Sequence, residues 1–439
     1  MNVQSERPGE EQGTDRRAAN IVLFNIPADG HVNPNLAFAA KLVRRGHRVS
    51  FSIDERHAPQ VRATGATPVV YDTTFPRADR WERFPLHDVI EMSSLFLDEA
   101  IAVLPQQRKA FEDARPDLVL YDYAALSAQV LAHEWGVPAV RLSPTRVSSR
   151  TYEEDLAPFY ASVAEDERWR AYRRRFRRWL DDAGIGMPVD RFLYVGFADH
   201  CVVTVPRQFQ ADATEQDTDH TFVGPVVREQ EHQEPWVPPA GGRPVPLVAF
   251  GTIAPEVPQV QRVYFECLEA FADSPWHVVM SIGRQLDPEV FGELPGNIEL
   301  LPPQLQILAH ADAFVTHAGM GSVMEAIHHA VPLIAVPMGF DQTENARVIE
   351  RLGIGARLPF EGVTGQEIRK AADEVRGDPE VGQRRREGRE DVRRAGGARP
   401  AGDAIERLLT RRQAGEAQPL GGGQVVPRPD AEVTHARGE

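Results

Sequence analysis

The chain has 439 residues, of which 42% are hydrophobic, and it carries a formal net charge of -15 at pH 7. This length suffices for two domains with substantial cores, whereas the negative charge argues against a general affinity for nucleic acids. The two cysteines lack metal-ligand spacing, the polar N-terminus lacks the apolar core of a signal peptide, and no apolar run is long enough to span a bilayer, so we expect a soluble, cytoplasmic protein.

The chain begins with a pattern typical of a doubly wound α/β domain. Residues 1–18 are charged and almost free of large apolar groups, so we predict a disordered tail. An apolar strand at 21–24 is followed by a loop over 27–34, a helix from Asn35 and a second strand at 48–53. Sheets of this kind bind ligands at their carboxyl edge, where this loop lies.

The same edge carries a histidine and an aspartate. His31 lies in the loop just before the helix, and Asp122 ends a strand predicted over 116–122. A carboxylate that accepts the imidazole N–H fixes its tautomer and stabilises the imidazolium formed on proton uptake. A loop histidine is also often a surface residue, and an aspartate here also suits a helix cap, so both interpretations stay open from the residues alone.

A basic, aromatic segment at 169–179 has two interpretations. Its aromatic residues fall on one helical face and its arginines on the others. Such a helix can bind a membrane or an anionic partner. Acidic residues flank the segment on both sides, which favours a surface helix that packs its aromatic stripe against the protein.

A change of composition marks the best domain boundary in the chain. Residues 227–244 are acidic, polar and rich in proline and glycine, which predicts a linker, and a second sheet then begins with a strand at 247–252. We therefore predict an N-terminal domain at 19–226, a linker at 227–244 and a C-terminal domain at 245–400. A disordered tail precedes them at 1–18, and a final helix at 401–411 and a second disordered tail at 412–439 follow them.

The most informative stretch runs from Ala313 to Asn345. A short buried strand at 313–315 is followed by a sharp break at 317–321, a helical pattern and a second apolar run at 331–336. The N-terminus of the helix in such a unit points at the carboxyl edge of the sheet. Its unpaired N–H groups and its dipole attract a phosphate there.

Four residues at this break suit a phosphate. Gly319 and Gly321 allow the backbone to approach closely. Ser322 adds a hydroxyl donor, and His317 offers an imidazole. The glycines alone would equally fit a tight turn between packed elements. A dinucleotide-binding fingerprint would need a third glycine where Met324 stands, which disfavours a nicotinamide oxidoreductase.

Three more residues suit a nucleotide sugar. Glu325 lies one helical turn beyond the serine, where it can accept hydrogen bonds from a ribose diol. Asp341 and Gln342 follow the second strand and pair a carboxylate with a carboxamide, which suits neighbouring hydroxyls of a hexose. Phosphate donors, a diol acceptor and a sugar-binding pair in one stretch predict a nucleotide-sugar site.

This stretch resembles the donor-binding signature of the family 1 glycosyltransferases, and most closely that of the bacterial macrolide and antibiotic glycosyltransferases. The resemblance extends from about residue 20 to residue 409. It implies the α/β fold called GT-B, in which two Rossmann-like doubly wound parallel-sheet domains face each other across a cleft. The residues that carry it are His317, Gly319, Ser322, Glu325, Asp341 and Gln342.

The resemblance also implies roles for residues outside this stretch. His31, which follows a glycine, corresponds to the general base of the family, and Asp122 to its partner. Thr252 would bind the β-phosphate, and Gln304 belongs to the donor site. The helix at 401–411 would cross back to brace the N-terminal domain.

One loop departs from the family pattern. The usual tryptophan that stacks on the nucleobase is replaced by Leu301, so Leu301 and Pro302 would give the base only apolar contact. The choice between uracil and thymine is therefore open.

The resemblance implies an inverting hexosyltransferase that moves a hexose to a hydroxyl of a hydrophobic natural product, such as a macrolide or another polyketide. The expected donor is UDP-glucose. The nucleotide sugar is a co-substrate, and we expect no cofactor and no metal, because the helix dipole and the imidazole of His317 offset the charge of the leaving diphosphate. The donor region from 245 to 400 contains no Asp-x-Asp motif.

Several alternatives stay open. One is a dTDP-deoxysugar transferase of antibiotic biosynthesis, and another is a nucleotide-sugar epimerase of the same fold. A non-catalytic partner of a transferase is disfavoured because His31 and Asp122 are both present. The acceptor, a role in biosynthesis or in resistance, and the oligomeric state, monomer or homodimer, cannot be read from the sequence.

Overall fold

The computed structural model describes residues 18–76, 88–147, 152–210, 220–226, 236–251, 258–283, 286–300 and 304–413. Most of both predicted tails and half of the predicted linker lie outside these residues, as do Thr252, Leu301 and Pro302. The predicted divisions of the chain therefore stay predictions.

The N-terminal part of the described chain forms a seven-stranded parallel sheet in the order β3-β2-β1-β4-β5-β6-β7. Its strands are β1 (Asn20–Phe24), β2 (Arg48–Ile53), β3 (Thr67–Val70), β4 (Leu118–Asp122), β5 (Ala139–Ser143), β6 (His200–Val203) and β7 (His220–Phe222). The helical segments between them are α1 (Asp29–Arg44), α2 (Ala58–Ala63), α3 (Val89–Ala110), α4 (Leu126–Trp135), α5 (Tyr152–Val163), α6 (Glu167–Asp182), α7 (Val189–Tyr194) and the short η2 (Arg207–Phe209). The strand order reverses beside β1, which brings the ends of β1 and β4 together at the carboxyl edge.

The second part forms a six-stranded parallel sheet, within the described residues, in the order β10-β9-β8-β11-β12-β13. Its strands are β8 (Pro246–Ala249), β9 (Val278–Ser281), β10 (Ile298–Leu300), β11 (Ala313–Thr316), β12 (Leu333–Ala335) and β13 (Gly355–Arg357). Its helical segments are α8 (Pro258–Phe271), η4 (Pro288–Phe291), α9 (Gln304–Leu308), α10 (Met320–His329), α11 (Phe340–Arg351), α12 (Gly365–Gly377) and α13 (Pro379–Ala395), and α14 (Ala398–Gln413) ends the described chain.

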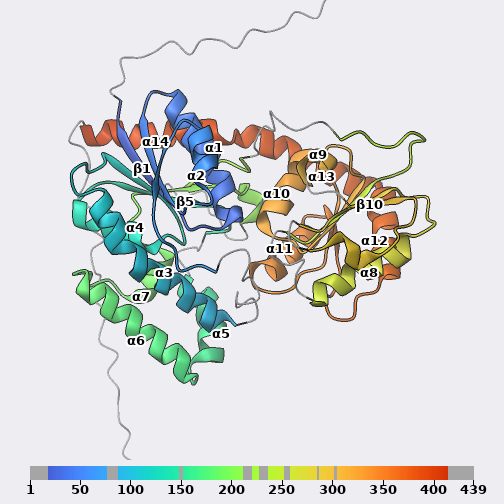
Figure 1. Ribbon diagram of the computed structural model, residues 1–439, viewed down its shortest axis with the longest axis horizontal. Coiled ribbons are helices and arrows are strands. Elements are labelled where there is room, and N and C mark those ends of the chain that lie inside the picture. The colour runs from blue at the N-terminus through green and yellow to red at the C-terminus, as the bar shows by residue number, and fades with distance from the viewer. Residues whose placement is uncertain are drawn as a thin grey trace, which may run out of the picture.

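These two sheets confirm the predicted fold class of two Rossmann-like α/β units. We call the first sheet with its helices the N-terminal lobe, and the second sheet with its helices up to α13 the C-terminal lobe. Figure 1 shows the lobes side by side, with α10 and α11 on the side of the C-terminal lobe that is turned toward the N-terminal lobe. The central strands β1, β4 and β5 are buried, and they read as apolar runs because helices cover both faces of the sheet.

The first helix starts earlier than the sequence predicted. We expected a loop over 27–34 and a helix from Asn35, but α1 begins at Asp29 and contains Pro34. Pro34 is the sixth residue of α1 and has no N–H to donate, so the helix loses one backbone hydrogen bond there and continues. His31 therefore lies in the first turn of α1 rather than in a free loop.

The last described helix returns to the N-terminal lobe. Figure 1 shows α14, in red, running from the C-terminal lobe along α1. Ala401, Ile405 and Leu409 of α14 are buried in one apolar cluster with core residues of the first sheet. At its polar side, Arg45 Nη2 donates to Asp403 Oδ1 at 2.6 Å, and Arg45 Nη1 lies 3.3 Å from Glu406 Oε2.

The basic segment forms α6 and uses its aromatic stripe for packing. Trp169, Tyr172, Phe176 and Trp179 are all buried. Arginines on the other faces pair with acidic residues, among them Arg173 with Asp190 and Arg175 with Asp98. Among the helices that the structure describes, none is both long enough and apolar enough to cross a membrane.

The packing of α14 predicts a stability effect. Replacing the fully buried Ile405 by alanine should lower the free energy of unfolding by about 2–5 kcal/mol, because it removes apolar contacts and leaves a cavity. Urea unfolding followed by tryptophan fluorescence measures the loss. Arg407→Ala, at an exposed position of the same helix, is the matched control. Equal stabilities of the two variants would contradict the packing described here.

Candidate active site

His31 and Asp122 are in direct contact, as the sequence predicted for a catalytic pair. His31 Nδ1 lies 2.9 Å from Oδ1 and 3.0 Å from Oδ2 of Asp122. Asp122 ends β4 and its side chain is fully buried, whereas the side chain of His31 is 21% exposed. The same carboxylate accepts the N–H of Ala124 at 2.9 Å, so it also stabilises the turn after β4. The helix-cap interpretation of Asp122 is wrong, because α4 begins at Leu126 after the N-cap Ala125 and has no side-chain cap.

The surroundings make the His31 imidazole more basic than usual. Burial lowers its pKa, but the charge of Asp122 and the hydrogen bond to it, with a further contribution from Asp341, outweigh burial and raise the pKa above 6.5. Because Nδ1 faces the carboxylate, the neutral ring carries its proton on Nδ1 and leaves the lone pair on Nε2. The ring of Tyr123 stacks on the imidazole, with ring centroids 5.4 Å apart and an interplanar angle of 25°.

Residues from the C-terminal lobe face this pair. Asp341, in the first turn of α11, is close enough to His31 that each acts on the pKa of the other. Although Asp341 is accessible to water, the atoms around its carboxyl group raise its pKa by desolvation, and Asn345, His31 and Arg146 oppose that rise. Arg146, beyond β5, also reaches Glu344 of α11 at 3.5 Å. The two lobes therefore meet at this site.

Two glycines make room for His317. A Cβ atom on Gly319 would lie 2.4 Å from Nε2 of His317, and one on Gly251 would lie 3.0 Å from its Cε1. Burial between these residues lowers the pKa of His317 to about 4. Gly319 precedes α10 and has no side chain with which to cap its N–H groups. The imidazole and the N-terminus of α10 thus lie together at the end of β11.

A buried asparagine fixes the loop that carries His317. Ala318 has a φ of 63°, which is unusual for a residue with a Cβ atom. Asn345, fully buried on α11, donates from Nδ2 to the carbonyl of Ala318 at 3.0 Å and to Oδ2 of Asp341 at 3.2 Å. One side chain therefore fixes both the histidine loop and the carboxylate of Asp341.

The other described residues predicted for the donor site lie on α9, α10 and α11. Ser322 and Glu325 lie half-buried on α10, and Gly321 is exposed in its first turn. The side-chain oxygen Oε1 of Gln342 accepts the N–H of Met338 at 2.9 Å, which fixes the carboxamide of Gln342. Gln304 begins α9, but its side chain lies outside the described part of the chain. Among the described residues, no group of three His, Cys, Asp or Glu side chains could hold a metal ion.

Three residues of this site were not predicted from the sequence: Tyr123, Arg146 and Asn345. Asn345 lies four positions after Asp341 on one helix, and this spacing, which puts both on one face, could have indicated their contact. Tyr123 directly follows Asp122, but nothing in the sequence indicates that its ring stacks on a histidine. The contact of Arg146 with Glu344 depends on how the two lobes meet.

Comparisons with known proteins agree with the fold described above. A model of the family described as UDP-glucoronosyl and UDP-glucosyl transferase matches residues 218–382. The oleandomycin glycosyltransferase of Streptomyces antibioticus is 40% identical over 404 residues, which cover 91% of this chain and 93% of the relative. The crystal structure of a kitacinnamycin glycosyltransferase has a TM-score of 0.82 at 38% identity, and that of the calicheamicin glycosyltransferase CalG4 has 0.77 at 32%, each covering 90% of this chain and 100% of its own.

The glycine packing around His317 predicts a change in titration. In Gly319→Ala the added Cβ atom should push the imidazole out of its buried position, so the pKa of His317 should rise from about 4 toward 6.5. Proton NMR of the imidazole Cε1–H measures this shift, with the resonance assigned by its loss in His317→Gln. Gly377→Ala is the control, because a Cβ atom there meets no atom within 4 Å. An unchanged titration in Gly319→Ala would disprove the packing.

Proposed function

The chain belongs to the UDP-glucoronosyl and UDP-glucosyl transferase family and is a glycosyltransferase, and from this premise we propose that it transfers a hexose from a nucleotide diphosphate sugar to a hydroxyl of a hydrophobic natural product. The single observation that carries the proposal is the contact of His31 with Asp122 on one lobe, opposite Asp341 on the other. The reaction is a direct displacement that inverts the anomeric carbon.

His31 is the general base of this reaction. Asp122 accepts the Nδ1–H, so Nε2 takes the proton of the acceptor hydroxyl. The acceptor oxygen bonds to the anomeric carbon as the bond from that carbon to the β-phosphate oxygen breaks, and the diphosphate leaves with the bonding electrons. The resulting imidazolium is stabilised by Asp122 and, across the interface of the lobes, by Asp341.

The leaving diphosphate binds at the N-terminus of α10. Backbone N–H groups and the helix dipole provide positive potential there. His317 is neutral in the protein without donor, because burial lowers its pKa to about 4. It therefore contributes first through an N–H hydrogen bond, and a bound diphosphate favours its protonation. These groups take the place of a metal ion in our proposal.

We propose UDP-glucose as the first candidate donor and a hydrophobic natural product as the acceptor. Asp341 and Gln342 suit the hydroxyls of glucose, and the family description names UDP sugars, which favours UDP-glucose. A dTDP-linked deoxysugar is the second candidate, because Leu301 leaves the choice of base open. Relatives named for oleandomycin, kitacinnamycin and calicheamicin support a macrolide or another hydrophobic natural product as acceptor. The epimerase alternative finds no support in these relatives.

A donor panel tests the proposal. We expect a mass increase of one hexose on an acceptor such as oleandomycin with UDP-glucose, measured by mass spectrometry, with dTDP-glucose and dTDP-rhamnose as competing donors. His31→Ala should abolish transfer while calorimetry still detects binding of UDP. Full turnover in His31→Ala would refute the base, and release of an altered sugar without acceptor would favour the epimerase.

The raised pKa of His31 predicts the acid limb of the pH profile. The base acts unprotonated, so transfer should fall as the pH is lowered through a pKa above 6.5. Asp122→Asn removes the charge that raises this pKa, so the acid limb should move to lower pH and the maximal rate should fall about 100-fold or more. Initial rates at saturating donor measure both effects. A limb that does not move would exclude His31 as the titrating group.

A further inference from the structure

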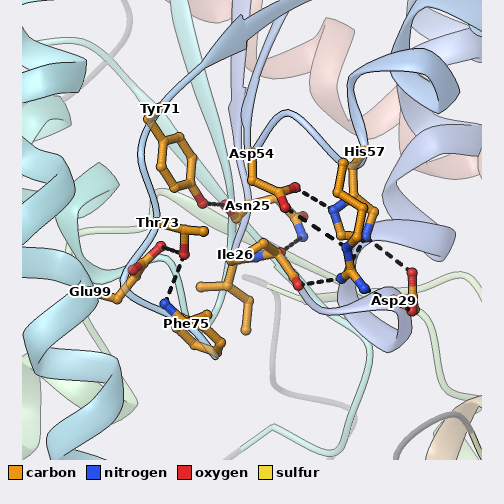
Figure 2. Close-up of polar contacts among 11 residues, drawn as sticks. Asn25, Ile26, Asp29, Asp54, His57, Tyr71, Thr73, Phe75 and Glu99 are labelled. Carbon is orange, nitrogen blue, oxygen red and sulfur yellow. Dashed lines mark hydrogen bonds and ion pairs between the residues drawn. The ribbon is translucent and has the colours of Figure 1, made fainter. Parts of the chain in front are cut away.

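A second histidine lies next to the helix that carries His31. His57 precedes α2 and is only 1% exposed. Figure 2 shows its ring between Asp54 and Asp29. Nδ1 forms a short hydrogen bond with Asp54, and Nε2 lies 3.1 Å from Oδ1 of Asp29. Asp29 is the first residue of α1, two positions before His31.

The position of these groups matters because α1 has no side-chain cap. Its N-cap is Ala28, and Oδ1 of Asp29 lies 3.1 Å from Nε2 of His57. Arg56, in the turn after β2, donates from Nη2 to the carbonyl of Pro27 at 2.9 Å, so it ties the same segment. The start of α1 is therefore held from the end of β2, through Asp54, Arg56 and His57.

The charge of His57 decides how firmly Asp29 is held. A carboxylate only accepts hydrogen bonds, so contact with both Asp54 and Asp29 requires an N–H on each ring nitrogen. Burial lowers the pKa of His57, and so does the charge of Arg56. The hydrogen bonds to Asp29 and Asp54 outweigh these two effects, so the pKa of His57 is raised. Nε2 also lies 3.2 Å from Nη2 of Arg56. After loss of the proton, Nε2 accepts from Arg56 and no longer donates to Asp29.

We propose that Asp54, His57 and Asp29 form a positioning clamp, in which the imidazolium of His57 holds the first turn of α1 so that His31 presents Nε2 to the acceptor. This inference rests on the proposed function, because it concerns the same base. The charged groups that act on the ring are Asp54 after β2, Asp29 on α1 and Arg56 in the turn, while Glu55 of that turn is exposed. The clamp residues are positioning residues, since none of them touches the reacting atoms.

The pH dependence follows from the two histidines. His31 acts unprotonated and sets the acid limb, whereas His57 acts protonated, so transfer should decline as the pH rises through the pKa of His57. Asp29→Asn keeps an acceptor for Nε2 but removes the charge, so the pKa of His57 and the alkaline limb should both move to lower pH. His57→Gln keeps an N–H donor but cannot titrate, so it should lose the alkaline limb.

Kinetics of three variants test the clamp. Asp29→Asn and His57→Gln should lower kcat about tenfold at the optimum and change the KM for the donor by less than about twofold, because the base is displaced and the donor site is not. His277→Gln is the matched control, since His277 forms a similar contact with Glu299, 2.7 Å long, in the C-terminal lobe. Profiles of both variants that match this control would overturn the clamp.

Proton NMR tests the same coupling without turnover. The Cε1–H resonance of His31 should show a second inflection at the pH where His57 titrates, and this inflection should move to lower pH in Asp29→Asn. We expect Asp29→Asn to fold, because the side chain of Asp29 is partly exposed and asparagine has nearly the same shape. A His31 resonance that ignores the titration of His57 would overturn the clamp. Coupled resonances in a protein that transfers no sugar would instead refute the proposed function and leave the clamp standing.

Discussion

A fully buried carboxylate at the end of β4 constrains the geometry of the whole site. Burying such a group is costly unless hydrogen bonds compensate it. Asp122 is compensated by the N–H of Ala124 and by the imidazole of His31, which comes from a different element. The first turn of α1 must therefore stay within hydrogen-bond distance of β4. This requirement explains why the start of α1 is tied at several points although it lacks a side-chain cap.

The second constraint is electrostatic and acts between the lobes. Asp341 helps to raise the pKa of His31, and His31 in turn opposes the rise that desolvation causes in the pKa of Asp341. The carboxylate that we assign to the sugar thus also favours the imidazolium that forms when the base takes a proton. Any movement that separates the lobes weakens both effects together. The contact between Arg146 and Glu344 lies on the same interface and favours the same approach of the lobes.

The sequence was sufficient to predict features that depend on local pattern. Apolar runs and glycine breaks predicted two parallel sheets, and the carboxyl-edge rule predicted that His31 lies near Asp122. The sequence-based prediction failed for the start of α1, because residues 27–34 were predicted as a loop and the helix begins at Asp29. It also could not predict Tyr123 over His31 or Arg146 beside Glu344, because those contacts depend on packing between distant elements.

The two histidines of the site differ because their surroundings differ. Both imidazoles are desolvated, which by itself lowers a pKa. His31 has a carboxylate against Nδ1 and another across the interface, so its pKa rises, whereas His317 packs between Gly251 and Gly319 and its pKa falls to about 4. A basic imidazole suits the removal of a proton from the acceptor. A neutral imidazole can donate an N–H hydrogen bond to the negatively charged diphosphate. Opposite shifts of like groups within one site are the physical basis for assigning them different roles.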